Sequence, residues 1–175
     1  MLTEIDFTIL DFIQENMRSG IGDILMKGIS LLGNHGILFI ATALCLLLFK
    51  KTRKAGFMLA IALAAGLVVC NVVLKNAVGR IRPFDIVSFP LLISPPTDFS
   101  FPSGHTLHSF ICASVIHCSL SRRWGIAAYV FSAIMGFSRM YLYVHYPSDV
   151  LAGALLGVAI GRCSVRLCNK YLLKK

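Results

Sequence analysis

The sequence predicts an all-α protein: an integral membrane helical bundle of about five transmembrane helices plus an N-terminal amphipathic helix in the membrane interface. Two observations predict this class. Hydrophobic residues make up 57% of the 175 residues and charged residues only 14%, against about 25% charged residues in soluble domains. The apolar residues also form runs close to the roughly 20 residues that a helix needs to cross the hydrocarbon core. This length suits one domain, so residues 1–175 are treated as a single membrane-embedded unit.

The first expected element is an amphipathic helix at residues 1–17. Acidic residues interrupt it too often for a membrane span, while apolar side chains recur at helical spacing. These apolar side chains are Ile5, Ile9, Leu10, Phe12 and Ile13. We therefore expect the helix to lie in the interface without crossing the membrane. The N-terminus lacks the basic start and apolar core of a signal peptide, so no cleaved leader is expected.

Five apolar segments follow, and each is predicted to span the membrane. They run from about Ser30 to Leu48, Ala55 to Val78, Ser103 to Ser119, Trp124 to Tyr143, and Pro147 to Leu167. The two glycines within 33–36 predict a kink in the outer part of the first span, because glycine permits backbone angles that interrupt a helix. A proline-containing loop at residues 84–101 joins the second and third spans.

The distribution of charge predicts which ends of the spans face the cytoplasm. The net charge is +9, and most basic residues lie in the links at 50–54 and 122–123 and in the tail at 162–175. These regions contain no acidic residue, so the positive-inside rule makes them cytoplasmic. The N-terminus is then extracytoplasmic, the C-terminus is cytoplasmic, and the protein is expected in the cell membrane. Because no basic stripe with interleaved aromatic residues occurs, we expect the bilayer, and not nucleic acid, as the partner.

The cysteines and carboxylates do not suggest a metal centre. Six cysteines are present, none forms a C-x-x-C pair, and nearly all lie in apolar runs. A buried cysteine packs as a small hydrophobe, so we expect neither disulfides nor metal ligands from them. The acidic residues are not clustered in the sequence either, and we expect no metal and no other cofactor.

The first polar motif lies at the outer end of the second span and contains Lys75, Arg82 and Pro83. Lys75 and Arg82 are seven residues apart, which would place them on one face of a helix. A lysine offers a point charge and an arginine a planar fork, and both suit a phosphate group. Two cations that snorkel to the interface are an equally good interpretation of this motif alone. Arg80 between them either adds a contact or snorkels as well.

The second motif, Phe101–His105, opens the third span. A helix N-terminus presents free N–H groups and the positive end of the helix dipole, so it is a natural site for an anion. Gly104 would let the backbone approach a ligand, and His105 would lie on the first turn beside it. An ordinary helix cap with a surface histidine is the competing interpretation.

The third motif, Ser138–Asp149, spans the outer turn between the last two spans and includes Arg139. Pro147 suits the first position of a helix. Asp149 follows His145 by four residues, close enough for its carboxylate to accept a hydrogen bond that fixes the imidazole tautomer and leaves the other nitrogen free to attack. Each motif is weak alone, but all three meet at one rim, where ionisable residues are costly and point to function.

These motifs strongly resemble the signature of the type 2 phosphatidic acid phosphatases, the lipid phosphate phosphatases related to vanadium haloperoxidases. The signature has three parts: K-x6-R-P, P-S-G-H and S-R-x5-H-x3-D. Lys75–Pro83, Pro102–His105 and Ser138–Asp149 match them in order and spacing. Many members have six spans, whereas the first span is reduced here to the amphipathic helix.

The resemblance implies an enzyme that removes phosphate from a lipid without a metal. It implies that His145 is a nucleophile that forms a phosphohistidine, that Asp149 orients it, and that His105 is the general acid. The groups expected to bind the phosphoryl oxygens are Lys75, Arg82, Arg139, Ser103 and the Gly104 N–H. Three cations and a helix N-terminus would supply the charge compensation that phosphoryl transfer requires.

The resemblance leaves the substrate open. Conversion of undecaprenyl pyrophosphate to undecaprenyl phosphate fits an outward-facing site, and phosphatidylglycerophosphate, phosphatidic acid and lipid A phosphates are alternatives. A non-catalytic lipid-phosphate binder or flippase is a second class, and vanadate-dependent oxidation a third. The loop at 84–101 would rest on lipid and either gate a lipid tail or remain passive. No role follows for His35, His108 is either structural or in contact with substrate, and the oligomeric state is undetermined. Gly153, Gly157 and Gly161 favour close internal helix packing over dimerisation.

Overall fold

The computed structural model describes residues 2–172, and every regular element in this range is helical. Twelve helical segments follow one another along the chain. They are α1 (Leu2–Asn16), α2 (Gly20–Gly33), η1 (Asn34–Gly36), α3 (Ile37–Leu48), α4 (Arg53–Leu67), η2 (Val68–Leu74), α5 (Lys75–Val78), α6 (Pro83–Ile86), α7 (Gly104–Ser119), α8 (Arg122–Tyr141), α9 (Pro147–Leu167) and η3 (Cys168–Leu172). The predicted all-α class is confirmed for these residues. Lys174 and Lys175, which contribute to the predicted cytoplasmic charge, lie outside the described range.

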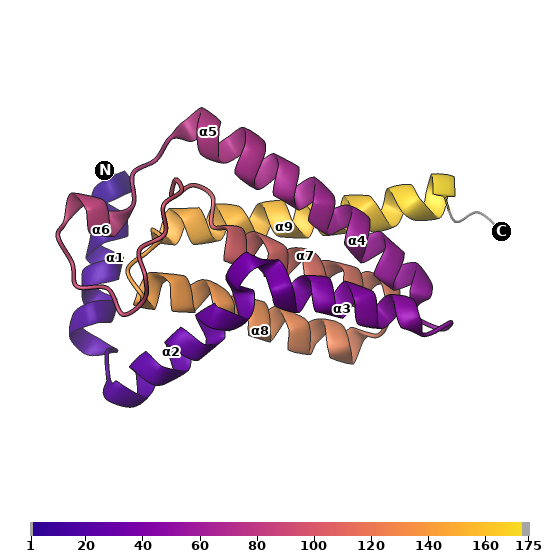
Figure 1. The fold of residues 1–175 in the computed structure, drawn as a ribbon, viewed down its shortest axis with the longest axis horizontal. Helices are drawn as coiled ribbons and strands as arrows, with labels where there is room; N and C mark the ends of the chain where they lie inside the picture. Colours follow the sequence, from indigo (N-terminus) through magenta and orange to yellow (C-terminus); the bar gives the residue numbers. More distant parts are fainter. Residues whose placement is uncertain (1, 173–175) are drawn as a thin grey trace.

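The long helices run along one common axis, and the polar motifs gather at one end of it. Helices α3, α4, α7, α8 and α9 run along the long axis of the molecule, whereas α1 lies across one end, beside α6 and the loop that follows it (Figure 1). The link between α3 and α4 and the end of α9 lie at the opposite end (Figure 1). The predicted basic links therefore lie far from the motif-bearing end.

Helix α7 forms the centre of the bundle and packs against α4, α8 and α9. Its apolar side chains Leu107, Ile111 and Val115 are fully buried, and so is the hydroxyl-bearing Ser114. Because α7 faces protein on most sides, it can carry small polar side chains that a lipid-facing helix would have to avoid. This explains how α7 can bury Ser109 and Ser114 in the middle of the bundle.

The glycines of α9 bring its backbone directly against α7, as the sequence predicted. A Cβ atom on Gly157 would lie 2.5 Å from the carbonyl oxygen of Leu107, and one on Gly153 would lie 2.8 Å from the carbonyl oxygen of Ser103. Gly161 packs in the same way against Ser114. The glycine ladder is therefore an internal packing device, with no room for a side chain at any of its three positions.

The lipid-facing surface supports a membrane protein, although not the full predicted count of spans. Three helical stretches in the described residues are long and apolar enough to cross a membrane: Gly20–Leu48, Arg53–Ile86 and Pro147–Tyr171. The other two predicted spans correspond to α7, which has only 16 residues, and α8, which has 20 residues but contains Arg122, Arg123 and Arg139, and neither is among these three stretches. A count of five spans remains a prediction.

The start of the first predicted span is wrong by about ten residues. Helix α2 begins at Gly20 instead of near Ser30, because the Ser19 side chain accepts a 3.1 Å hydrogen bond from the backbone N–H of Gly22 and caps the helix there. The predicted kink is confirmed, since His35 and Gly36 have left-handed φ angles of 53° and 69°. The predicted N-terminal helix is also present, and its Asp6, Leu10 and Ile13 are buried against the bundle end.

Candidate active site

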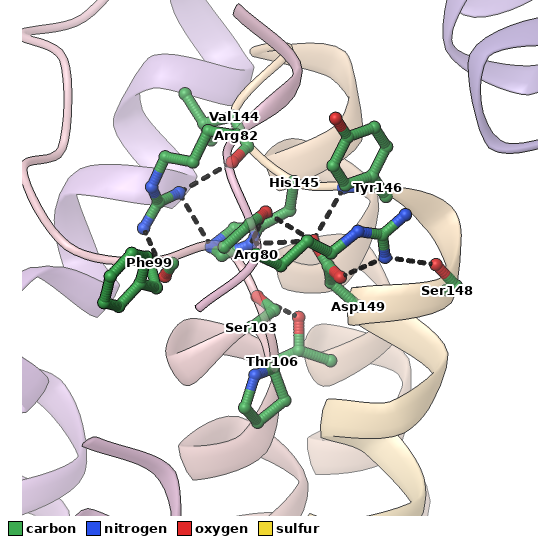
Figure 2. A network of polar contacts seen from close by, with 12 residues as sticks. Arg80, Arg82, Phe99, Ser103, Thr106, Val144, His145, Tyr146, Ser148 and Asp149 are labelled. Atoms are coloured by element: carbon green, nitrogen blue, oxygen red, sulfur yellow. Dashed lines mark hydrogen bonds and ion pairs between the residues drawn. The ribbon is translucent and has the colours of Figure 1, made fainter. Parts of the chain in front are cut away.

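The three motifs meet in one large cavity at the motif-bearing end of the bundle. The cavity has a volume of about 1150 Å³ and lies between the α2–α3 kink, α4 and the N-terminal end of α7. Its lining includes Lys75, Arg82, Gly104, His105, Arg139 and His145. The three motifs, distant from one another in the sequence, thus contribute two imidazoles and three cations to one space, and Figure 2 shows part of their polar network.

The three cations are deeply buried, with exposed fractions of 6% for Lys75, 3% for Arg82 and 2% for Arg139. The predicted helical relationship between Lys75 and Arg82 is wrong. The helix ends at Val78 because Gly79 adopts a left-handed φ of 59°, and Arg82 follows in extended conformation. The two side chains still reach the same place, since the chain turns at Gly79 and leads Arg82 back towards the cavity.

Asp98 bridges the two cations of the first motif, and sequence reasoning missed it. Its Oδ1 accepts a 2.6 Å hydrogen bond from Arg82 Nη2, and its Oδ2 accepts one from Lys75 Nζ. Its backbone carbonyl accepts a further 2.7 Å bond from Arg82 Nε. Partial burial alone would raise the pKa of Asp98, but the hydrogen bonds and charges of Lys75 and Arg82 lower that pKa to about 2.

His145 lies in the turn between α8 and α9, between an arginine and a carboxylate. Its Nε2 is 3.2 Å from Nη1 of Arg82, and its Nδ1 is 3.5 Å from Oδ2 of Asp149. An arginine only donates, so Nε2 must accept, and the ring proton is then on Nδ1, facing Asp149. Burial, together with the charges of Arg82 and Arg139, holds the pKa of His145 well below 6.5, which leaves the ring neutral.

Asp149 is fully buried and its carboxylate is held by three further donors (Figure 2). Oδ2 accepts 2.5 Å and 3.1 Å hydrogen bonds from Ser100 Oγ and the Tyr146 N–H, and Oδ1 accepts a 2.6 Å bond from Arg80 Nη1. From the sequence, Arg80 was expected either to add a phosphate contact or to snorkel. In the structure it does neither, and it instead fixes the carboxylate beside His145. The sequence carried no signal for Ser100, because a lone serine in a loop has many structural uses.

The network extends to α1 through Asp6, which is buried. Its Oδ2 accepts from Arg80 Nη2 at 2.7 Å and from Ser148 Oγ at 2.6 Å, and its Oδ1 accepts from the Ser148 N–H at 2.9 Å. Arg80 also lies over the ring of Tyr146, 3.8 Å from its centroid. The predicted interfacial helix thus contributes a side chain that is three contacts away from His145, through Arg80 and Asp149.

The loop at 84–101 packs against the turn that carries His145, and its predicted contact with lipid stays a prediction. Phe89 stacks on Tyr143 with ring centroids 4.2 Å apart, and Leu91 joins the same cluster. These apolar contacts cover Tyr143, a residue with a left-handed φ of 59°, and hold the turn in place. The loop therefore supports the site from outside the bundle.

His105 lies on the first turn of α7 and faces the α2–α3 kink. Its Nε2 is 3.1 Å from Oδ1 of Asn34, and a Cβ atom on Gly33 would lie only 2.4 Å from its Cδ2. The neighbouring His108 also lines the cavity, but its Nδ1 is 2.8 Å from the Gly104 carbonyl and its ring stacks on Phe39. His35 lines the outer part of the cavity from the kink itself.

The N-terminus of α7 behaves only partly as predicted. Ser103 is fully buried and is not among the residues that line the cavity, whereas Gly104 is. The Ser103 hydroxyl accepts a 3.0 Å hydrogen bond from the Thr106 hydroxyl (Figure 2). The backbone N–H of Ser103 donates a 3.2 Å bond to the backbone carbonyl of Asp149. Ser103 therefore links the second motif to the third in this structure.

Arg139 is a buried cation with unused donor capacity. Its Nη1 donates to the Ser30 hydroxyl, while its Nε has no hydrogen-bond partner within residues 2–172. A buried donor without a partner is costly, so an anion that enters the cavity would be stabilised there. In the described residues, no group of three or more histidine, cysteine, aspartate or glutamate side chains is placed to hold a metal ion.

A helical bundle with membrane-type spans and a cavity lined by buried cations has the architecture that a membrane phosphatase requires. The sequence profile of the PAP2 superfamily matches residues 53–172, and the chain belongs to that superfamily. This confirms the resemblance seen in the three motifs, and the chain is a membrane lipid phosphatase.

Characterised relatives place it among enzymes of lipid phosphates. The chain is 36% identical over 152 residues to an undecaprenyl-diphosphatase of Sulfolobus acidocaldarius, and this alignment covers 86% of this chain and 73% of the relative. It is 35% identical over 127 residues to an undecaprenyl-diphosphatase of Bacillus subtilis, with 70% and 65% covered. The crystal structure of a transmembrane PAP2-type phosphatidylglycerolphosphate phosphatase from Bacillus subtilis superposes with a TM-score of 0.81 at 25% identity, over 99% of this chain and 89% of that one.

Proposed function

We propose that this lipid phosphatase converts undecaprenyl diphosphate to undecaprenyl phosphate through a phosphohistidine at His145, without a metal ion. The observation that carries this proposal is the orientation of His145. His145 lines a cavity with three buried cations, its Nε2 lies 3.2 Å from Arg82 Nη1, and its Nδ1 faces the carboxylate of Asp149. This is the arrangement that a neutral imidazole needs to act as a nucleophile.

The chemistry then takes two steps. In the first, His145 Nε2 attacks the terminal phosphorus, the bond from phosphorus to the bridging oxygen breaks, and His105 gives a proton to that leaving oxygen. In the second, water attacks the phosphohistidine, the phosphorus–nitrogen bond breaks, and His105 takes a proton from the water. Asp149 stabilises the positive charge that the His145 ring carries between these steps.

The cations stabilise the charge that moves during both steps. The transferred group spreads its charge over three equatorial oxygens, and the cavity offers Lys75, Arg82 and Arg139 to meet them. The Gly104 N–H at the start of α7 adds a donor with the positive end of the helix dipole behind it. Because these groups are buried, their attraction for the phosphoryl oxygens is screened less than it would be in water.

The cavity walls favour a lipid over a soluble phosphate ester. Beyond the polar groups, the cavity continues between α3 and α4 along apolar side chains. These include Phe39, Ile40, Leu44, Leu47, Leu63 and Leu67. A polyprenyl chain can lie there while its phosphates reach the cations. The relatives support undecaprenyl diphosphate, and the structural neighbour makes phosphatidylglycerophosphate the second candidate.

The proposed topology has five spans, α1 in the interface, the site on the extracytoplasmic side and the C-terminus in the cytoplasm. The basic links at 50–54 and 122–123 lie at the end opposite the site, in agreement with the positive-inside rule. A cysteine introduced at Asp85 should react with an impermeant maleimide in intact cells above the wild-type background, and one at Lys51 should not. The reverse result would invert the topology.

The proposed reaction is tested with purified protein in detergent and an excess of chelator. We expect phosphate release from undecaprenyl diphosphate to exceed release from phosphatidylglycerophosphate and phosphatidic acid. Substrate labelled with 32P in its terminal phosphate should give an acid-labile phosphoenzyme in the wild type and none in His145→Ala. Activity that requires added divalent ions, or a labelled His145→Ala protein, would contradict the mechanism.

A further inference from the structure

In the absence of substrate, the carboxylate of Asp98 pairs with Lys75 and Arg82, two of the cations proposed to bind phosphate. One carboxylate oxygen contacts Lys75 and the other contacts Arg82, so each cation has an oxygen partner of the kind that a phosphoryl group would supply. These two cations are almost completely buried. Without Asp98, they would have neither a carboxylate partner nor enough solvent to stabilise their charges. Uncompensated buried charge is costly, so an internal anion stabilises the empty site.

The carboxylate of Asp98 is free to leave, although the backbone that carries it is not. Its side chain is 53% exposed, in contrast to the cations it contacts. Besides the main cavity, Asp98 borders a second cavity of about 370 Å³ that is also lined by Asn76 and Thr97. Meanwhile Arg82 Nε holds the Asp98 carbonyl at 2.7 Å. A rotation about the side-chain bonds therefore releases both cations without moving the loop.

We propose that Asp98 is a displaceable internal anion, which yields Lys75 and Arg82 to the phosphoryl group of the substrate and returns to them as inorganic phosphate leaves. The proposal rests on the assignment of Lys75 and Arg82 as phosphate ligands in the proposed function. By competing for both cations, the carboxylate lowers the affinity of the site for every anion by the same factor. It thereby prevents phosphate, the product, from remaining bound after each turnover.

A purely positioning role for Asp98 makes the opposite prediction. If the carboxylate only held Lys75 and Arg82 in place, its loss would let the cations move and phosphate would bind more weakly. The decisive variant is Asp98→Asn, which keeps the shape of the side chain and removes its charge. Asp85→Asn is the matched control, because Asp85 lies in the same segment and is exposed. Its backbone N–H donates to the Arg82 carbonyl, but its carboxylate forms no ion pair with Lys75 or Arg82, which both pair with Asp98.

The experiment measures the inhibition constant of inorganic phosphate and the KM of the lipid substrate for both variants and the wild type. We expect both constants to fall in parallel in Asp98→Asn, by roughly tenfold on the scale of one charge-assisted hydrogen bond, with no change in Asp85→Asn. Asp98→Glu retains a carboxylate and should keep the inhibition constant near the wild-type value. Unchanged or weaker phosphate inhibition in Asp98→Asn would overturn the proposal.

Thermal unfolding with inorganic phosphate separates this proposal from the assignment of the phosphate ligands. Without phosphate, Asp98→Asn should unfold at a lower temperature than the wild type, and saturating phosphate should remove that difference because it replaces the missing anion. Failure of phosphate to restore Asp98→Asn while it stabilises the wild type would refute the proposal alone. If phosphate neither stabilised nor inhibited any of the proteins, the assignment of Lys75 and Arg82 would fall, and the role of Asp98 with it.

Discussion

Arg80 donates a 2.6 Å hydrogen bond to the buried carboxylate of Asp149, and its other terminal nitrogen donates to Asp6 of the N-terminal helix. One guanidinium thus shares its charge between two carboxylates from opposite ends of the sequence. The second carboxylate matters for the chemistry, because an Arg80 that faced Asp149 alone would draw more charge from it and weaken its attraction for the Nδ1–H of His145, which lies 3.5 Å from Asp149 Oδ2.

We expect Asp6→Asn to lower kcat by about tenfold, the effect of a modest loss of electrostatic stabilisation near the reacting atoms, with a KM within about twofold of the wild type. Asp6 contacts Arg80 and Ser148 and does not reach the cavity, so substrate binding should be preserved. Steady-state kinetics on the lipid substrate provide the measurement. Glu15→Gln on the exposed side of the same helix should leave kcat unchanged, and equal losses in the two variants would show that α1 acts only through charge or stability.

Gly157→Ala should lower the melting temperature in detergent by several degrees, in line with the roughly 1–3 kcal/mol that overpacking costs in a well-packed core. The added Cβ would lie 2.5 Å from the Leu107 carbonyl oxygen and 2.8 Å from the Phe110 Cβ, and neither atom can move without shifting α7. Gly28→Ala is the matched control, since no atom lies within 4 Å of a Cβ there. A melting temperature for Gly157→Ala equal to that of Gly28→Ala would show that α7 and α9 are not packed as described.

Gly33→Ala should affect activity more than stability. Its Cβ would lie 2.4 Å from Cδ2 and 3.2 Å from Nε2 of His105, and a side-chain ring can turn aside more easily than a backbone can. A displacement of a reacting group by about 1 Å can cost up to a hundredfold in rate, so we expect kcat to fall at least tenfold. The test compares the kcat and the melting temperature of Gly33→Ala with those of Gly28→Ala. An unaltered kcat in Gly33→Ala would exclude His105 from the chemistry.

The ion pairs of Asp98 predict how stability depends on pH. Lys75 and Arg82 hold the pKa of Asp98 at about 2, below its ordinary value of 3.8. A carboxyl group with a lowered pKa in the folded state contributes stability that is fully present above about pH 4 and is lost as the pH falls through about 2. In phosphate-free buffer, the difference in melting temperature between the wild type and Asp98→Asn should stay constant down to about pH 4 and then narrow. A difference that already disappears between pH 5 and 4 would mean that Asp98 is not paired in solution.

The sequence predicted most of the helices because their signals are local. Apolar runs, Pro147 at a helix start and the glycines at 33–36 each act within one or two turns, so α9 begins and ends at the predicted residues and the kink lies where it was expected. The three motifs also carried fixed spacings. Gly79 was the failure: it ends the helix before Arg82, and a single glycine near a helix end gives little indication of whether the chain stops there.

The supporting residues of the site could not be predicted in the same way. Asp6, Ser100 and Asp98 lie in an amphipathic helix and in a loop, where aspartate and serine are common for reasons of solubility and turn geometry. Their partners are 16 to 142 residues away in the sequence. Only the folded chain shows that each one reaches a charged or reactive group, because long-range polar contacts leave no periodic pattern.

The glycine contacts between α7 and α9 also determine how the enzyme should lose activity on heating. His105 lies on one of these helices and Asp149 on the other, and their separation is set where two backbones touch without intervening side chains. Such a seam offers no flexible group that could loosen first. Thermal inactivation should therefore coincide with separation of the bundle itself, and the reacting groups should keep their spacing up to that temperature.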